Sequence, residues 1–112
     1  MTPFQRRPIT VKQFEELVRL DGLCGELLER TKRHDATVPI GGFEASHARR
    51  FMAQTARFIS REPGADTLLR LPRDGDLDKA VLLATLADAR VALRAYADNH
   101  FDDDEVPAFL DG

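Results

Sequence analysis

The sequence predicts an all-α protein, a compact bundle of three to four helices followed by an acidic C-terminal tail. Two observations lead to this prediction. Apolar residues recur at helical spacing in several stretches of the chain, and proline or paired glycines separate these stretches. With 112 residues, 43% of them apolar and 31% charged, the chain has the size and composition of one globular domain with one core.

The first helix is expected over about residues 11–34. Thr10 precedes it and Gln13 follows three residues later, so each side chain can accept a hydrogen bond from the other's free backbone N–H. Two apolar faces follow, a third of a turn apart: Val11, Phe14, Leu17 and Val18, then Leu20, Leu23, Cys24, Leu27 and Leu28. Gly22 stands at the change of face, and glycine costs about 1 kcal/mol against alanine inside a helix. We therefore expect a kink or short break near Asp21 and Gly22.

A loop over residues 35–42 leads to a second helix, expected over residues 44–61. One side of this helix is apolar, with Ala48, Phe51, Met52, Thr55, Phe58 and Ile59. The opposite side carries Arg50, Gln54, Arg57 and Arg61. Glu62, Pro63 and Gly64 are expected to end the helix, because proline lacks a backbone donor and restricts the residue before it.

After a short segment over residues 65–71, interpreted as a helical turn laid over the core, and a turn at 72–75, a long helix is expected over residues 77–98. Asp76 or Asp78 caps it. Leucines form one face of this helix, with Leu82, Leu86, Ala89 and Leu93. The opposite face is formed by Ala80, Ala84, Ala87, Val91 and Ala95. A helix that is apolar on two sides needs two packing partners, so this helix is either central in the monomer or shared between the monomer core and a homodimer. In the second case the alanine face is the candidate dimer interface.

Charge divides the chain unevenly. Residues 1–29 carry four basic and five acidic side chains, residues 30–61 carry seven and two, and residues 62–112 carry five and twelve. We expect an N-terminal arm over residues 1–9, a helical bundle over 10–100 and an acidic tail over 101–112 that begins with the run Asp102, Asp103, Asp104 and Glu105. Two alternatives stay open for the tail: disorder, or docking of its apolar residues on a groove of its own or a neighbouring chain.

The single cysteine, Cys24, excludes an intrachain disulfide and a tetrathiolate zinc site. It is expected to be a small buried hydrophobe. No apolar run follows the N-terminal arginines, and charged residues interrupt the longest apolar stretch, so neither a signal peptide nor a membrane span is expected. These observations favour a cytoplasmic protein.

Metal sites have weak support. Glu44 and His47 have the Glu-x-x-His spacing of di-iron bundles, but neither His34 nor His100 has a glutamate three residues before it, so the second copy of the motif is missing. No specific metal is expected there.

A calcium loop is also excluded. Asp74, Asp76 and Asp78 resemble the start of one, but Lys79 replaces the required glycine and Thr85 the bidentate glutamate. No cofactor is predicted.

Catalytic motifs are missing as well. The sequence contains no Gly-x-Ser-x-Gly elbow, no phosphate loop and no dinucleotide fingerprint, and no base is placed beside Cys24 by spacing. The sequence therefore favours a protein that is not an enzyme.

Nucleic-acid binding is the main alternative function. The basic residues Lys32, Arg33, His34, Arg50, Arg57 and Arg61 form a phosphate-contacting patch if the first two helices lie side by side. A helix-turn-helix reading fails, because it buries Asp21 and places Glu26 and Glu29 on the recognition helix. Gly41 and Gly42 before a helix are only a weak anion-site signal, because Glu44 opposes an anion.

The favoured interpretation is a non-enzymatic protein-interaction or regulatory module that forms a homodimer. Recognition of a second protein is assigned to the charged residues Arg50, Arg57, Arg61, Asp102, Asp103, Asp104 and Glu105. Nucleic acid is a less favoured partner, membranes are not expected partners, and a metal-dependent enzyme built around Glu44 and His47 is the least favoured function.

Overall fold

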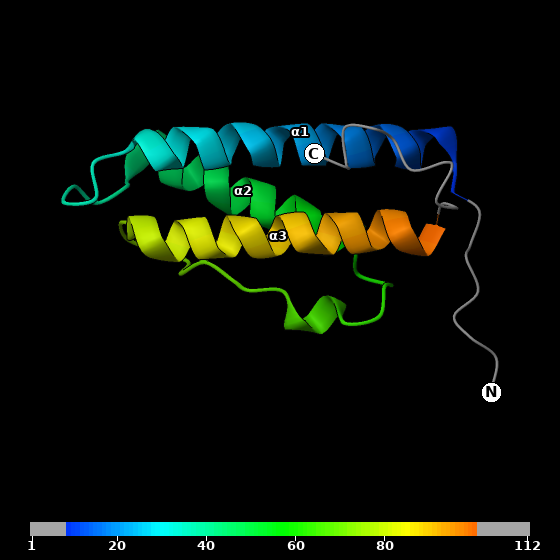
Figure 1. Ribbon diagram of the computed structural model, residues 1–112. Helices are drawn as coiled ribbons and strands as arrows, with labels where there is room; N and C mark the ends of the chain where they lie inside the picture. Colours follow the sequence, from blue (N-terminus) through cyan, green and yellow to red (C-terminus); the bar gives the residue numbers. More distant parts are fainter. Residues whose placement is uncertain (1–8, 101–112) are drawn as a thin grey trace.

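The computed structural model describes residues 9–100, and over this range the chain forms three α-helices and one 3-10 turn. The elements are α1 (Val11–Arg33), α2 (Gly42–Phe58), η1 (Ala65–Thr67) and α3 (Lys79–His100). Helices α1 and α3 lie side by side and antiparallel, α2 lies behind them, and the segment containing η1 runs along the side of α3 that faces away from α1 (Figure 1). The all-α prediction is confirmed, with three helices in the described residues. The predicted tail lies outside them.

Helix α1 is continuous, so the predicted break near Gly22 is wrong. Its buried residues form one stripe at helical spacing: Leu17, Leu20, Asp21, Cys24, Leu27, Leu28 and Thr31. The first of the two predicted apolar faces was misleading, because its residues Val11 and Val18 lie at the surface, 75% and 37% exposed. Packing of the continuous stripe outweighs the helix propensity lost at Gly22.

The predicted caps of α1 and α3 are present. The Gln13 N–H donates to Thr10 Oγ1 at 3.1 Å, and the Thr10 N–H donates to Gln13 Oε1 at 2.8 Å. At the start of α3, Asp78 Oδ1 accepts from the Ala80 N–H at 2.9 Å. These contacts satisfy donors that a helix N-terminus leaves free.

The predicted leucine face of α3 is buried, and it packs against the stripe of α1 and the apolar side of α2. The largest fully buried side chains include Phe51 of α2, Leu17 and Leu20 of α1, and Leu86 and Leu93 of α3. The three helices therefore share one core.

Helices α2 and α3 differ from the expected boundaries because of their flanking segments. Leu77 is extended and exchanges two backbone hydrogen bonds with Ile40, of 2.8 and 2.6 Å, so α3 begins at Lys79. At the other boundary, Ile59 caps α2 and accepts a hydrogen bond from the Glu62 N–H at 2.8 Å, so the chain turns before Pro63. The predicted turn over the core is present as η1.

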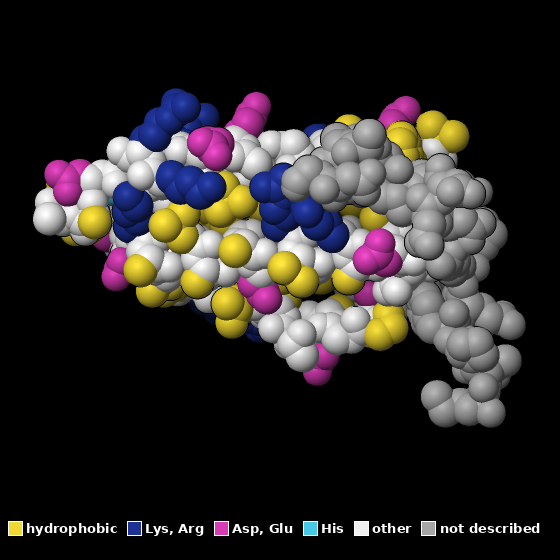
Figure 2. All heavy atoms as spheres, in the orientation of Figure 1, with side chains coloured by type: hydrophobic (Ala, Val, Ile, Leu, Met, Phe, Trp, Pro, Cys, Tyr) yellow, Lys and Arg dark blue, Asp and Glu magenta, His cyan; other side chains and the backbone are white. Residues whose placement is uncertain are grey.

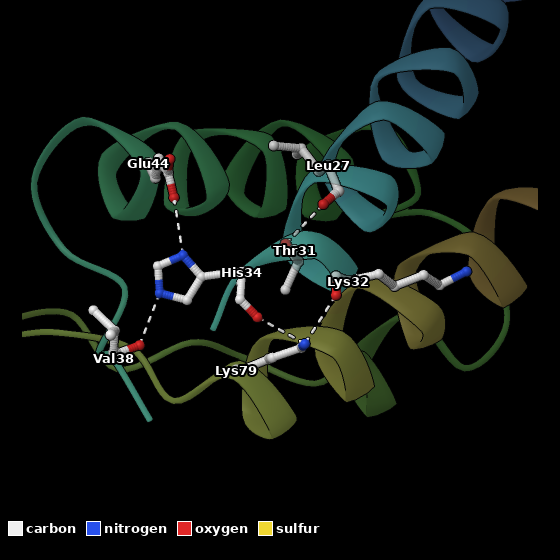
Figure 3. Close-up of polar contacts among 7 residues, drawn as sticks. All are labelled: Leu27, Thr31, Lys32, His34, Val38, Glu44 and Lys79. Atoms are coloured by element: carbon white, nitrogen blue, oxygen red, sulfur yellow. Dashed lines mark hydrogen bonds and ion pairs between the residues drawn. The ribbon is translucent and has the colours of Figure 1, made fainter. Parts of the chain in front are cut away.

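The C-terminal end of α1 is closed by a lysine from α3 (Figure 3). Lys79 Nζ donates to the backbone oxygens of Lys32 and His34, at 2.9 and 2.8 Å. Beside it, His34 Nε2 donates to the Val38 carbonyl at 2.7 Å. An ammonium at this position satisfies free carbonyls and complements the negative end of the helix dipole.

Within residues 9–100, none of the helices combines the length and the apolar character that crossing a membrane requires.

Candidate interaction surfaces

The alanine face of α3 is exposed along its length. Ala80, Ala84, Ala87 and Ala95 are all exposed, Val91 is 67% exposed, and the neighbouring Val81 is 45% exposed. Figure 2 shows hydrophobic side chains spaced along the outward side of α3, with Lys and Arg side chains where it lies beside α1. In the described part of the chain, the segment containing η1 lies beside the C-terminal half of this face, where Val91 and Ala95 line a shallow hollow, and the five residues of the face stay exposed.

The six predicted basic-patch residues do not form one patch. His34 Nδ1 lies 3.9 Å from Glu44 Oε2 in the first turn of α2 (Figure 3). Arg57 is 13 residues farther along α2, which corresponds to about 20 Å of helix. Arg57 and Arg61 line a hollow with Gln13 near the start of α1, at the opposite end of the bundle. Lys32, Arg33 and His34 therefore lie at one end of the bundle, Arg57 and Arg61 lie at the other, and Arg50 lies between them on α2.

Arg50, Arg57 and Arg61 are exposed as predicted. No ion pair joins any of the three to a carboxylate among residues 9–100. The four acidic residues predicted to share in partner binding, Asp102, Asp103, Asp104 and Glu105, lie outside the described residues. The three arginines thus remain available to an external or C-terminal anion.

An apolar groove of about 380 Å³ lies between the outer side of α2 and the segment after η1. Met52, Ala53 and Ala56 line it from α2, and Leu68, Leu69, Arg70, Leu71, Pro72 and Arg73 line it from the other side. Sequence reasoning missed this groove, because it assigned residues 65–71 only to covering the core. The available signal was three leucines within four residues of a segment too short to bury them all.

Arg49 of α2 holds residues 72–75 in place at one edge of this groove. Its guanidinium donates to the Pro72 carbonyl at 2.8 Å and to the Gly75 carbonyl. Glycine at position 41 lets the Asp76 carboxylate approach the start of α2, where a Cβ would collide with it. The weak anion-site signal at Gly41 and Gly42 therefore corresponds to a place already approached by a carboxylate of the protein.

Glu44 and His47 are not brought together with further ligating residues. Glu44 faces His34, and the His47 ring packs against Phe43 with centroids 5.9 Å apart. In the described range, no group of three or more His, Cys, Asp or Glu side chains is arranged to hold a metal ion.

Cys24 is fully buried, as predicted, and its Sγ donates to the Leu86 carbonyl at 3.3 Å. Burial raises the pKa of the thiol to about 11, despite the opposing influence of Arg90. Because the thiolate is the reactive form, Cys24 is inert in the folded chain.

Asp21 is a buried carboxylate that sequence reasoning placed at a helix break. It is 5% exposed, and its Oδ1 has no hydrogen-bond partner in the described residues. Desolvation raises the pKa of this carboxyl, while the positive charges of Arg90 and Arg94 lower it by less. Ionisation of Asp21 therefore opposes folding.

Asp21→Asn is expected to be more stable than the wild type at neutral pH. The Asp21 pKa is higher in the folded chain than its ordinary value of 3.8, so this group destabilises the fold progressively as pH rises above 3.8. Below 3.8 both states are protonated and the advantage of the variant disappears. Urea unfolding of both proteins across this pH range measures the difference, with exposed Glu26→Gln as the control. An Asn variant less stable at neutral pH would show that attraction to Arg90 and Arg94 outweighs desolvation.

The end of α3 is anchored to the segment that follows α2. Glu62 Oε1 accepts from the Asn99 side chain at 3.4 Å and lies 2.9 Å from His100 Nε2. The Tyr96 ring lies between those of His100 and Phe58, with both centroid distances 4.4 Å. These contacts fix the point at which the C-terminal segment begins.

Comparison of the chain with protein-family models, with curated proteins and with solved structures finds no match in any of the three.

Proposed function

We propose that this chain is a protein-interaction module that self-associates through the alanine face of α3. The observation that carries the proposal is the exposure of that face, defined by Ala80, Ala84, Ala87, Val91 and Ala95, with Val91 67% exposed. Contiguous exposed apolar surface on a soluble protein marks an interaction site. The proposed role is binding rather than catalysis.

The composition of this face favours a second copy of the same helix. Alanine side chains are short, so two such helices approach at the lower end of the usual 8–10 Å interaxial distance. In a two-fold dimer the same face is buried on both copies, so each exposed valine gains an apolar partner. A single substitution that introduces a charge on this face should therefore place two charges in the dimer interface, one from each copy.

Val91→Glu is expected to convert a homodimer into a monomer. The wild-type mass by static light scattering at micromolar concentration should be twice the 12.6 kDa of the chain, and the variant mass should equal it. Val11→Glu is the matched control, because Val11 is 75% exposed on α1, away from this face, and should leave the dimer intact.

A wild-type mass of 12.6 kDa would contradict self-association. A dimer unaffected by Val91→Glu would place the interface elsewhere on the molecule. Circular dichroism of each variant establishes that the helices are retained.

The alternative, a nucleic-acid-binding regulator, has less support. Its basic side chains are spread over about 20 Å along α2 instead of gathering in one patch, and His34 faces Glu44. Retention on a nucleic-acid column that falls with salt, and falls further in an Arg50, Arg57 and Arg61 triple alanine variant, would favour it.

A further inference from the structure

We propose that the C-terminal segment of this chain docks in the groove between α2 and residues 65–73. Residues 106–110 would fill the groove, and the acidic residues on either side would meet the arginines at its rim. The groove itself does not include the residues of the α3 face, so its occupation can be tested separately from the dimer.

The groove combines an apolar floor with a basic rim. Met52 and Ala56 of α2 face Leu68 and Leu71 across it, and Arg70 and Arg73 are exposed at its edge. Neither arginine forms an ion pair with a carboxylate in residues 9–100. A fitting occupant is therefore a short apolar segment that carries negative charge beside it.

The C-terminal sequence has this composition. The apolar run Val106, Pro107, Ala108, Phe109 and Leu110 follows four consecutive acids and precedes Asp111. No lysine or arginine occurs in residues 101–112. Proline limits the conformations of the free segment, which reduces the entropy lost on docking.

The groove lies within reach of the end of α3. The Leu69 N–H donates to Asp88 Oδ2 at 2.8 Å, so one wall of the groove is tied to α3 twelve residues before His100. Twelve residues of α-helix span about 18 Å. The six residues from 101 to 106 extend to about 20 Å. The segment can therefore turn back along the molecule and place residues 106–110 in the groove.

A second hollow connects the two places. It is lined by Asn99 near the end of α3, by Val91 and Ala95 at the edge of the α3 face, and by Ala65 and Leu68, which also line the groove. The hollow beside Arg57 and Arg61 is nearer to His100, but Gln13, Ser60 and Glu62 contribute to its lining. That hollow offers the acids a partner and gives the apolar run less to bury, so the groove is the better site.

Docking can be measured by NMR on the full-length chain. A maleimide nitroxide spin label is attached at Gly112→Cys, and it broadens the signals of amides that lie near it. Cys24 is fully buried and its pKa is raised to about 11, so the maleimide reagent attaches to the new cysteine. We expect the backbone amide signals of residues 53–56 and 68–73 to lose most of their intensity in the labelled chain. Reduction of the nitroxide should restore them.

Arg70→Glu with Arg73→Glu should abolish this loss of intensity, because like charges then meet at the rim. Phe109→Ser should also reduce it. The matched control is Arg30→Glu with Arg33→Glu, an equal charge change on exposed arginines of α1 that should leave the loss intact.

Unaffected signals at residues 53–56 and 68–73, or a loss that survives the Arg70 and Arg73 reversal, would overturn the proposal. A mixing experiment tests a second copy as the occupant. One sample of the chain carries the spin label, and a second sample carries only the isotope that makes its signals visible. A loss of intensity that appears only in the mixture would also overturn the proposal, because the segment of a second copy would then fill the groove. The dimer proposal is tested by the mass of the protein and the docking proposal by the loss of amide signals. Failure of one is therefore distinguishable from failure of the other.

Discussion

Phe51→Ala is expected to lower the free energy of unfolding by about 3–5 kcal/mol. Phe51 is 0% exposed and lies in the core shared by all three helices, so truncation removes apolar contacts and leaves a cavity. A loss of this size is a large part of the roughly 5–15 kcal/mol that stabilises a typical domain. Urea unfolding followed by circular dichroism measures it.

Phe43→Ala is the matched control for this experiment. Phe43 is on the same helix but is 79% exposed, so its replacement should change stability by no more than about 0.5 kcal/mol. Equal losses for the two variants would show that the face of α2 assigned to the core is wrong.

Lys79→Met is expected to cost about 1.5–3 kcal/mol of stability, the usual range for hydrogen bonds made by a charged group. Methionine keeps most of the aliphatic stem but removes the ammonium that donates to the carbonyls of Lys32 and His34. The last turn of α1 then loses both partners, and hydrogen exchange of its amides should accelerate.

Lys32→Met separates this effect from a change in net charge. The Lys32 side chain points away from Lys79 (Figure 3) and is 59% exposed, and only the Lys32 carbonyl accepts a hydrogen bond from the Lys79 ammonium. The control should retain nearly the full stability. A loss equal to that of Lys79→Met would assign the effect to net charge instead of capping.

Local signals in the sequence predicted local structure well. Thr10 and Gln13 cap α1 by contacts three residues apart, and the buried leucine face of α3 follows from spacing within one helix. The exposure of Arg57 follows from the same kind of reasoning. Each of these features depends on residues within a few turns of one another.

The features that sequence reasoning missed depend on distant parts of the chain. Gly22 stays helical because α1 packs against α3 along its length, and Asp21 is buried by the same packing. Lys79 caps a helix that ended 46 residues earlier, and the groove exists only because residues 68–73 lie across α2. Tertiary contacts determine the helical state of Gly22, the burial of Asp21, the cap by Lys79 and the groove. The periodicity within one segment carries no information about such contacts.

The most extensive helix contact of this protein, between α1 and α3, joins the beginning of the described chain to its end. The hydrogen bond from Cys24 to the Leu86 carbonyl, for example, spans 62 positions. Most helical bundles bring sequence neighbours together first and fold quickly for that reason. Here the central interface forms only after a long loop has closed, at a cost in chain entropy that grows slowly with loop length. We therefore expect this protein to fold more slowly than bundles of similar size whose main helix contacts join neighbours in sequence.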